Sequence, residues 1–198
     1  RFNDLVVEAG EGRDNFVPSG FPRLDKILGG GFIRSGLYII GARPAMGKST
    51  FAVNLADNID GNVMFVSLEM SPEQITAKRV ARLTGIPAAK LLRGAVTDDD
   101  WQKIAIANSA LSEQGVFINS RYDLTVQQIQ LLAQSVPELR AVVVDYLGLI
   151  TPTTRGGSTY ENISQISREL KRLAISLNIP VICLSQLSRA VEGRQNKR

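Results

Sequence analysis

The feature that most constrains the fold is an apolar run that ends in a glycine-rich loop. The run Leu37–Ile40 is followed by residues 41–50, which read Gly-Ala-Arg-Pro-Ala-Met-Gly-Lys-Ser-Thr. An apolar, β-branched run that stops at glycine and reaches Gly-Lys-Ser after a short loop is typical of a phosphate-binding loop that opens a helix. The eight-residue pattern that ends at Ser49 begins with Ala42, because its glycine is displaced to Gly41. We predict that this loop binds a nucleoside triphosphate.

The residue types of the loop fit this chemistry. Small residues and Gly47 let the backbone curl around a polyphosphate, and a helix that begins near Lys48 adds the positive end of its dipole. We expect Lys48 to reach the β- and γ-phosphates and the Ser49 hydroxyl to hold Mg²⁺. The candidate nucleotide-binding residues are Gly41, Ala42, Arg43, Pro44, Ala45, Met46, Gly47, Lys48, Ser49 and Thr50. A turn that contains glycine and lysine by chance is the alternative, and the strand before the loop argues against it.

The composition is typical of a soluble globular protein. The 198 residues are 44% hydrophobic and 21% charged, which is enough for one sizeable domain with a core. Lys and Arg number 23 against 19 acidic residues, and the net charge of +4 suits an anionic partner without requiring one. No apolar run approaches the ~20 residues of a membrane span, and nothing resembles a signal peptide. We therefore expect a cytoplasmic protein with no membrane partner.

The chain contains one cysteine and no histidine. Cys183 lies in an apolar run, where we expect burial rather than reactivity. A disulfide framework and a zinc site are excluded. The chain begins with Arg1 and ends in the polar, basic segment 194–198. We expect residues 1–198 to form a single domain that is truncated at both ends relative to a longer protein.

Short β-branched runs alternate with amphipathic stretches along the chain. We predict strands over residues 36–40, 63–67, 116–119, 141–145 and 181–185. We predict helices over residues 48–58, 71–83, 97–111, 125–134 and 161–177. Ser71 and Thr97 are candidate caps at the starts of two of these helices. Segments 1–35 and 152–159 read as irregular. The alternation predicts an α/β fold with a mainly parallel sheet covered by helices on both sides.

Polar side chains stand at the ends of three predicted strands. Nucleotide hydrolysis needs a carboxylate that organises the metal, a group that orients water and a sensor of the γ-phosphate. Asp145 ends an apolar run, as expected of a Walker B aspartate that holds Mg²⁺ through water. Glu69 is the candidate general base, and Gln186 is the candidate sensor. The structural alternatives are that Asp145 caps a turn, Glu69 stabilises a helix N-terminus and Gln186 is an exposed loop amide.

The irregular segment 152–159 leaves the carboxyl end of a predicted central strand. Parallel sheets bind ligands at that edge, so the segment is a candidate mobile binding loop. A floppy connector is an equally weighted alternative.

Four motifs, in this order, resemble the motor domain of DnaB-type replicative DNA helicases. They are Gly41 to Thr50, Ser67-Leu68-Glu69-Met70, Asp145-Tyr146-Leu147-Gly148-Leu149 and Leu184-Ser185-Gln186-Leu187-Ser188-Arg189. Further matches are Ser19-Gly20-Phe21, Leu24-Asp25, Gly29-Gly30-Gly31, Asp99-Asp100-Trp101 and Ile166-Ser167-Arg168-Glu169-Leu170-Lys171. The similarity extends from about Phe16 to Arg198. Many ATPases share the phosphate loop, whereas the other three motifs are specific to a narrow group.

The resemblance implies a RecA-like P-loop NTPase core that assembles as a homo-hexamer. It implies ATP bound between neighbouring subunits and single-stranded DNA in the central channel, translocated 5′ to 3′ so that the duplex separates. By the same resemblance, Lys48 and Ser49 are the phosphate and Mg²⁺ ligands and Asp145 is the Walker B acid. Glu69 is the catalytic carboxylate and Gln186 the sensor.

The resemblance also assigns parts of the motor to regions outside this sequence. Family members continue with a DNA-contacting Asp-Leu-Arg-Glu-Ser-Gly segment and with basic residues that reach a neighbour's γ-phosphate. A helical domain that meets primase precedes the motor. We expect primase and a helicase loader to act through these absent regions. Because an arginine finger is worth about 10³ to 10⁵ in rate, we expect this chain alone to bind ATP and Mg²⁺ but to turn over slowly and not to unwind DNA.

Two positions carry the resemblance less closely. Segment 152–159 corresponds to a channel-facing loop by position rather than by residue. Lys78 stands where relatives often have arginine, and lysine lacks the planar fork of a guanidinium.

Two other functions fit the same phosphate loop. A recombination or repair ATPase with a RecA/RadA-like core would form filaments and exchange strands. A nucleotide-gated regulatory ring would use hydrolysis only as a slow switch. The motifs at residues 67–70 and 185–189 favour the helicase.

Overall fold

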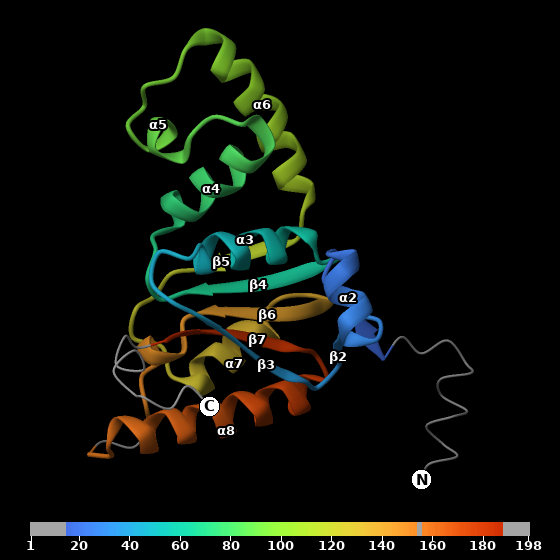
Figure 1. The fold of residues 1–198 in the computed structure, drawn as a ribbon, viewed down its shortest axis with the longest axis vertical. Coiled ribbons are helices and arrows are strands. Elements are labelled where there is room, and N and C mark those ends of the chain that lie inside the picture. The colour runs from blue at the N-terminus through green and yellow to red at the C-terminus, as the bar shows by residue number, and fades with distance from the viewer. Residues whose placement is uncertain (1–14, 154–155, 188–198) are drawn as a thin grey trace, which may run out of the picture.

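The centre of the molecule is a parallel β-sheet of five strands (Figure 1). The computed structural model describes residues 15–153 and 156–187. In spatial order the strands are β3 (Leu37–Ala42), β7 (Val181–Gln186), β6 (Leu139–Asp145), β4 (Asn62–Ser67) and β5 (Val116–Asn119). Every neighbouring pair is parallel, so the carboxyl ends of all five strands meet at one edge of the sheet. The predicted α/β fold is confirmed.

The register of the sheet brings the predicted site segments to the same edge. Ala42 pairs with Gln186 across β3 and β7, and Ser67 pairs with Asp145 across β4 and β6. The sequence predicts the first strand over residues 36–40, but β3 continues through Ala42. The prediction ended too early because pairing with β7 extends the ladder into the glycine-rich segment, where local propensity for strand is low.

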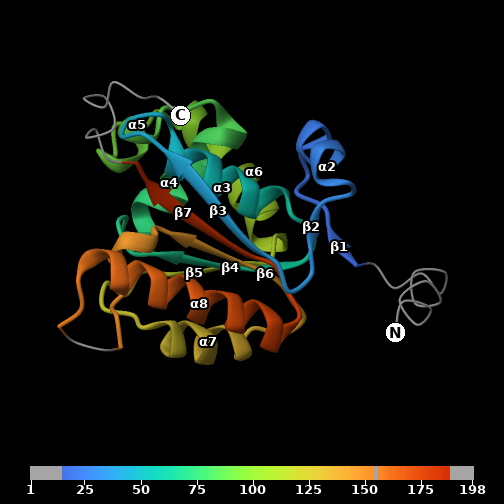
Figure 2. The same cartoon turned by 60° about the horizontal axis from the view of Figure 1, so that its bottom comes forward.

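Helices cover both faces of the sheet, as predicted (Figure 2). One face carries α7 (Val126–Gln134) and α8 (Thr159–Leu177), and the other carries α3 (Lys48–Asn58). Alternate residues of β4 divide between the two layers. Met64 and Val66 belong to the cluster on the α7 and α8 side, and Val63 and Phe65 belong to the cluster on the α3 side. Burial on both faces explains why these strands read as continuous apolar runs.

Three further helices form a unit that stands beyond α3 (Figure 1). They are α4 (Pro72–Thr84), α5 (Ala88–Leu92) and α6 (Asp98–Glu113). A small separate core holds them together, and its buried members are Val80, Ile86, Ile104, Ala107 and Leu111. Within the described ranges, no helix is both long and apolar enough to cross a membrane.

The predicted helix starts rest on side-chain caps. Ser71 accepts from the backbone N–H of Gln74, and Thr97 accepts from that of Asp100, each as part of a full capping box. Helix α8 begins at Thr159, earlier than the predicted residue 161, because Ser158 and Glu161 form another capping box. The prediction placed Glu161 at the helix start, whereas this residue occupies the third helical position.

The expectation that residues 15–35 are irregular is wrong. They form β1 (Phe16–Val17), α2 (Pro22–Leu28) and β2 (Phe32–Ile33), and β1 pairs with β2 in an antiparallel ladder. Close approach of the two strands requires Gly31, because a Cβ there would lie 2.6 Å from the carbonyl oxygen of Val17. Two-residue strands are too short to show a period. The 3₁₀ turn η1 (Leu147–Leu149) and α5 were also not predicted. Residues 1–14 lie outside the described residues.

Candidate phosphate-binding site

The glycine-rich loop joins the end of β3 to the start of α3. Gly47 is the N-cap of α3 with φ 80°, and Ala45 also adopts a left-handed conformation with φ 64°. Left-handed residues interleaved with ordinary ones curl a backbone into an anion-binding concavity. The N–H of Met46 donates to the carbonyl of Arg43 (3.3 Å) and closes the turn. The helix begins at Lys48, as predicted, so its positive dipole end faces the loop.

A pocket of about 250 Å³ opens at this loop. Its lining residues are Arg43, Pro44, Ala45, Gly47, Lys48, Ser49, Thr50, Glu69, Met70, Lys78 and Gln186. Most of the predicted nucleotide-binding residues are among them, together with Glu69 and Gln186 from two other strand ends. Gly41 and Ala42 are paired in β3 instead, and Met46 points its side chain to the surface with 74% exposure. Three basic side chains against one carboxylate suit a polyanion.

Lys48 is the point where the predicted groups meet. Its ammonium pairs with Oδ1 of Asp145 and lies 3.5 Å from Oε2 of Glu69. The same nitrogen lies over the ring of Tyr146, 4.2 Å from the ring centroid. The two acids differ in burial, since the Asp145 side chain is 1% exposed and that of Glu69 is 48% exposed. Asp145 is therefore a fixed inner charge, whereas Glu69 is open to water.

Backbone contacts fix both carboxylates relative to the sheet. The N–H of Leu68 donates to the carbonyl of Asp145 (2.8 Å), which ties the segment after β4 to the end of β6. The Ser67 hydroxyl donates to the carbonyl of Met70 (2.7 Å) and accepts from its N–H (3.1 Å). Glu69 thus lies in a turn closed by the serine at its start. This turn explains why the Ser-Leu-Glu-Met motif carries a serine three residues before methionine.

The oxygen atoms at this point fit a hard divalent cation. Oδ2 of Asp145 is buried and has no hydrogen-bond partner, although its other oxygen is paired with Lys48. A buried carboxylate oxygen without a donor costs free energy unless something else satisfies it. The pocket also contains the hydroxyls of Ser49 and Thr50. Carboxylate and hydroxyl oxygens are the donors that Mg²⁺ prefers.

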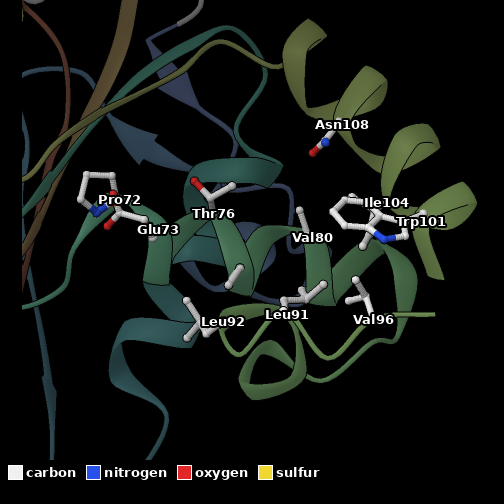
Figure 3. A pocket seen from close by; sticks show the side chains of 12 residues that line it. Pro72, Glu73, Thr76, Val80, Leu91, Leu92, Val96, Trp101, Ile104 and Asn108 are labelled. Carbon is white, nitrogen blue, oxygen red and sulfur yellow. The ribbon is translucent and has the colours of Figure 1, made fainter. Parts of the chain in front are cut away.

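A larger hollow lies in the helical unit and has a different chemistry (Figure 3). It measures about 560 Å³ between α4, α5 and α6, and apolar side chains such as Leu91, Val96, Trp101 and Ile104 line it. Glu73 is its one titratable lining residue. A negative charge and apolar walls do not suit a triphosphate, so the smaller pocket at the loop is the candidate site.

The structure adds residues that sequence reasoning left aside. The ammonium of Lys78 donates to the Thr50 hydroxyl (3.2 Å), which places it in the pocket wall. Tyr146 contacts Lys48 through its ring. Lys78 lies seven residues after the cap Ser71, so helical spacing could have placed it on the pocket side of α4. No sequence signal indicates the direction of the Tyr146 ring. Ser188 and Arg189, which belong to the last predicted motif, lie outside the described residues.

Comparison with known proteins agrees with this geometry. The family model described as "DnaB-like helicase C terminal domain" matches residues 16–198. The chain belongs to this family. The replicative DNA helicase DnaB of Geobacillus stearothermophilus is 39% identical over 196 residues, which cover 95% of this chain and 43% of that protein. The replicative DNA helicase DnaC of Bacillus subtilis (strain 168) is 39% identical over 190 residues, which cover 92% of this chain and 42% of that protein.

Solved structures of the family share the fold. A DnaB-like replicative helicase, described together with its interactions with primase, superposes with a TM-score of 0.86 at 36% identity and covers 98% of this chain and 50% of that chain. A helicase-like ATPase domain superposes with a TM-score of 0.85 at 36% identity and covers 98% of this chain and 72% of that chain. The RecA-like fold predicted from the sequence is confirmed. The chain spans about two fifths of the length of the curated relatives named above.

Proposed function

We propose that this chain is the ATP-hydrolysing motor domain of a 5′ to 3′ replicative DNA helicase. The observation that carries the proposal is the meeting of Lys48, Glu69 and Asp145 at one edge of the sheet, beside a curled loop at a helix N-terminus. Family membership supports the same function. Residues 1–198 act as one domain, and ATP is the substrate of the pocket.

The residues divide the work by charge and exposure. Lys48 and the loop backbone hold the β- and γ-phosphates, and Lys48 offsets the negative charge that develops there. Glu69 is half-exposed and lies at the mouth of the pocket, where it polarises the attacking water as a general base. Gln186 ends β7 and lines the pocket, so its amide senses the γ-phosphate and passes that state to the chain that follows.

Mg²⁺ is the metal that this donor set fits. The Ser49 hydroxyl and Asp145, through water, would hold it. When bound, the ion neutralises charge between the β- and γ-phosphates. Asp145 meanwhile keeps its inner position because backbone contacts and burial fix it.

The proposal extends to the assembly. The parent protein forms a cytoplasmic homo-hexamer with ATP between subunits and single-stranded DNA in the channel, and it meets primase and a loader through other regions. Segment 152–159 is the DNA-facing loop in this proposal. Its stem is tied to α8, since Thr153 donates to Glu169 (3.0 Å) and Gln165 donates to Thr153 (2.6 Å). Residues 154–155 of this segment lie outside the described residues.

Two substitutions in the full-length parent test the proposed roles. Lys48→Ala removes the cation that contacts phosphate, so we expect loss of ATP binding. Glu69→Ala removes only the base, so we expect binding close to that of the wild type and turnover reduced by about 10² to 10⁴. Equilibrium binding of a fluorescent ATP analogue and steady-state phosphate release measure the two effects separately. Equal loss of binding in both variants would contradict the division of roles.

A further inference from the structure

Tyr146 is a pocket neighbour that the proposed mechanism does not use. Its ring lies under the ammonium of Lys48, with the nitrogen 4.2 Å from the ring centroid, well inside the ~6 Å range of a cation–π contact. Tyr146 and Asp145 do not line the pocket, whereas Lys48 does. The ammonium therefore lies between the pocket and a wall made of one carboxylate and one aromatic face.

The ring is held from its other sides. Tyr146 packs against the cluster on the α3 side of the sheet, which includes Phe51 and Met70 at its margin. A Cβ at Gly148 would lie 3.1 Å from the ring, so the absence of a side chain there makes room for it. A ring packed in this way cannot follow the lysine, and it fixes where the ammonium rests.

Its chemistry differs from that of the two acids. Each carboxylate attracts Lys48 but also repels a triphosphate, so a third acid in this position would weaken anion binding. The negative face of a neutral ring stabilises the ammonium without adding net charge to the site. Lysine has a flexible four-carbon stem, and fixing its end before the phosphate arrives reduces the entropy lost on binding.

The geometry points to Tyr146 as a positioning residue that holds the Lys48 ammonium for the triphosphate through its aromatic face. This inference rests on the proposed function of the pocket. The phenol hydroxyl has no part in it, so Tyr146→Phe keeps the activity. Tyr146→Leu preserves an apolar side chain but removes the π face.

A fluorination series tests the π face without changing the shape of the side chain. Phenylalanine with zero, one, two and three ring fluorines is placed at position 146, and each substitution weakens the negative potential of the face. We expect the dissociation constant of a fluorescent ATP analogue with Mg²⁺ to rise steadily along the series. The trifluoro variant should bind about threefold to tenfold more weakly than the phenylalanine variant, and Tyr146→Leu at least as weakly.

The control is the same series at Phe117, an exposed position on the edge strand β5, where affinity should not change. Thermal unfolding midpoints that stay constant along the series at 146 exclude loss of folding. A flat series at 146, or wild-type affinity in Tyr146→Leu, overturns the role of the ring while leaving the proposed function intact. Failure of the wild-type chain to bind the analogue overturns the proposed function itself.

Discussion

At the scale of single residues, the site depends on differences in burial between chemically similar groups. Glu69 and Asp145 are both carboxylates within reach of Lys48, but one is open to water and the other is enclosed. The same enclosure acts on Cys183, which lies in β7 next to the strand that ends at Asp145. Identity alone therefore does not decide what these side chains can do.

Cys183 offers a direct test of this burial. Desolvation raises the pKa of the Cys183 thiol far above its usual range, and the charge of Asp145 adds to the effect. Because the thiolate is the reactive form, we expect no measurable reaction with a disulfide reagent at pH 8 in the native protein. One equivalent should react in denaturant, since the chain has a single cysteine. Rapid labelling of the native protein would show that the sheet is open at this strand.

At the scale of elements, a buried ion-pair cluster fixes α4 on the phosphate-loop helix. Asp57 near the end of α3 pairs with Arg79 (2.6 Å) and with Arg82 (3.3 Å) of α4. Arg79 also donates to Gln114 after α6 (3.2 Å). Lys78 adds a contact to Thr50 at the other end of α3. The helical unit is thus joined to α3 at both ends by polar side chains.

We expect Asp57→Ala to destabilise the fold strongly. The substitution leaves the buried Arg79 guanidinium without its carboxylate, which costs about 3–5 kcal/mol for a buried pair. Urea unfolding monitored by circular dichroism measures the loss. Asp99→Ala is the matched control, because its pair with Lys103 lies on the exposed surface of α6 and contributes little. Similar midpoints for the two variants would mean that the buried cluster does not hold α4.

The cap of α6 predicts a dependence on pH. The hydrogen bond from Lys90 lowers the pKa of Asp100 from 3.8 to about 2, with help from the backbone and hydroxyl of Thr97. A pKa lower in the folded than in the unfolded state adds stability above about pH 4, and this stability disappears as the pH falls from about 4 to about 2. The advantage of the wild type over Asp100→Asn in urea midpoint should therefore shrink across that interval. An advantage that stays constant from pH 7 to pH 2.5 is the contrary result.

The elements were predictable where sequence pattern and local chemistry agree. Helix α3 follows from the loop, and α4 and α6 from Ser71 and Thr97, because a cap is a local hydrogen-bonding choice. The strands follow from apolar runs buried on both faces. The β1 and β2 pair and α2 escaped prediction because their stability comes from packing with distant segments rather than from a repeat of their own.

At the scale of the whole molecule, a parallel sheet collects residues that are far apart in the chain. The three strand ends with Glu69, Asp145 and Gln186 were predictable as a set, since parallel strands end at one edge. The order of the strands was not, because it depends on crossovers that no local signal encodes. The contacts of Lys78 and Tyr146 were likewise beyond the sequence, since they depend on how α4 and η1 lie over α3.

The proposed assembly is a property of the parent protein. We expect the full-length protein with Mg²⁺, a non-hydrolysable ATP analogue and single-stranded DNA to have six times the subunit mass. A closed ring limits the mass, whereas a recombination-type assembly grows as an open filament. Light scattering after size-exclusion chromatography distinguishes the two. A mass that keeps rising with protein concentration would favour the filament.

The most direct measurement is a crystal structure of the chain with a non-hydrolysable ATP analogue and Mn²⁺ in place of Mg²⁺, with the metal located by its anomalous signal. We predict the triphosphate in the loop at residues 43–50, with the γ-phosphate at the Lys48 ammonium. The metal should lie between the Ser49 hydroxyl and Asp145, with Glu69 facing the γ-phosphorus. A nucleotide bound elsewhere, such as in the apolar hollow between α4 and α6, or a metal remote from Asp145, would contradict the proposed motor.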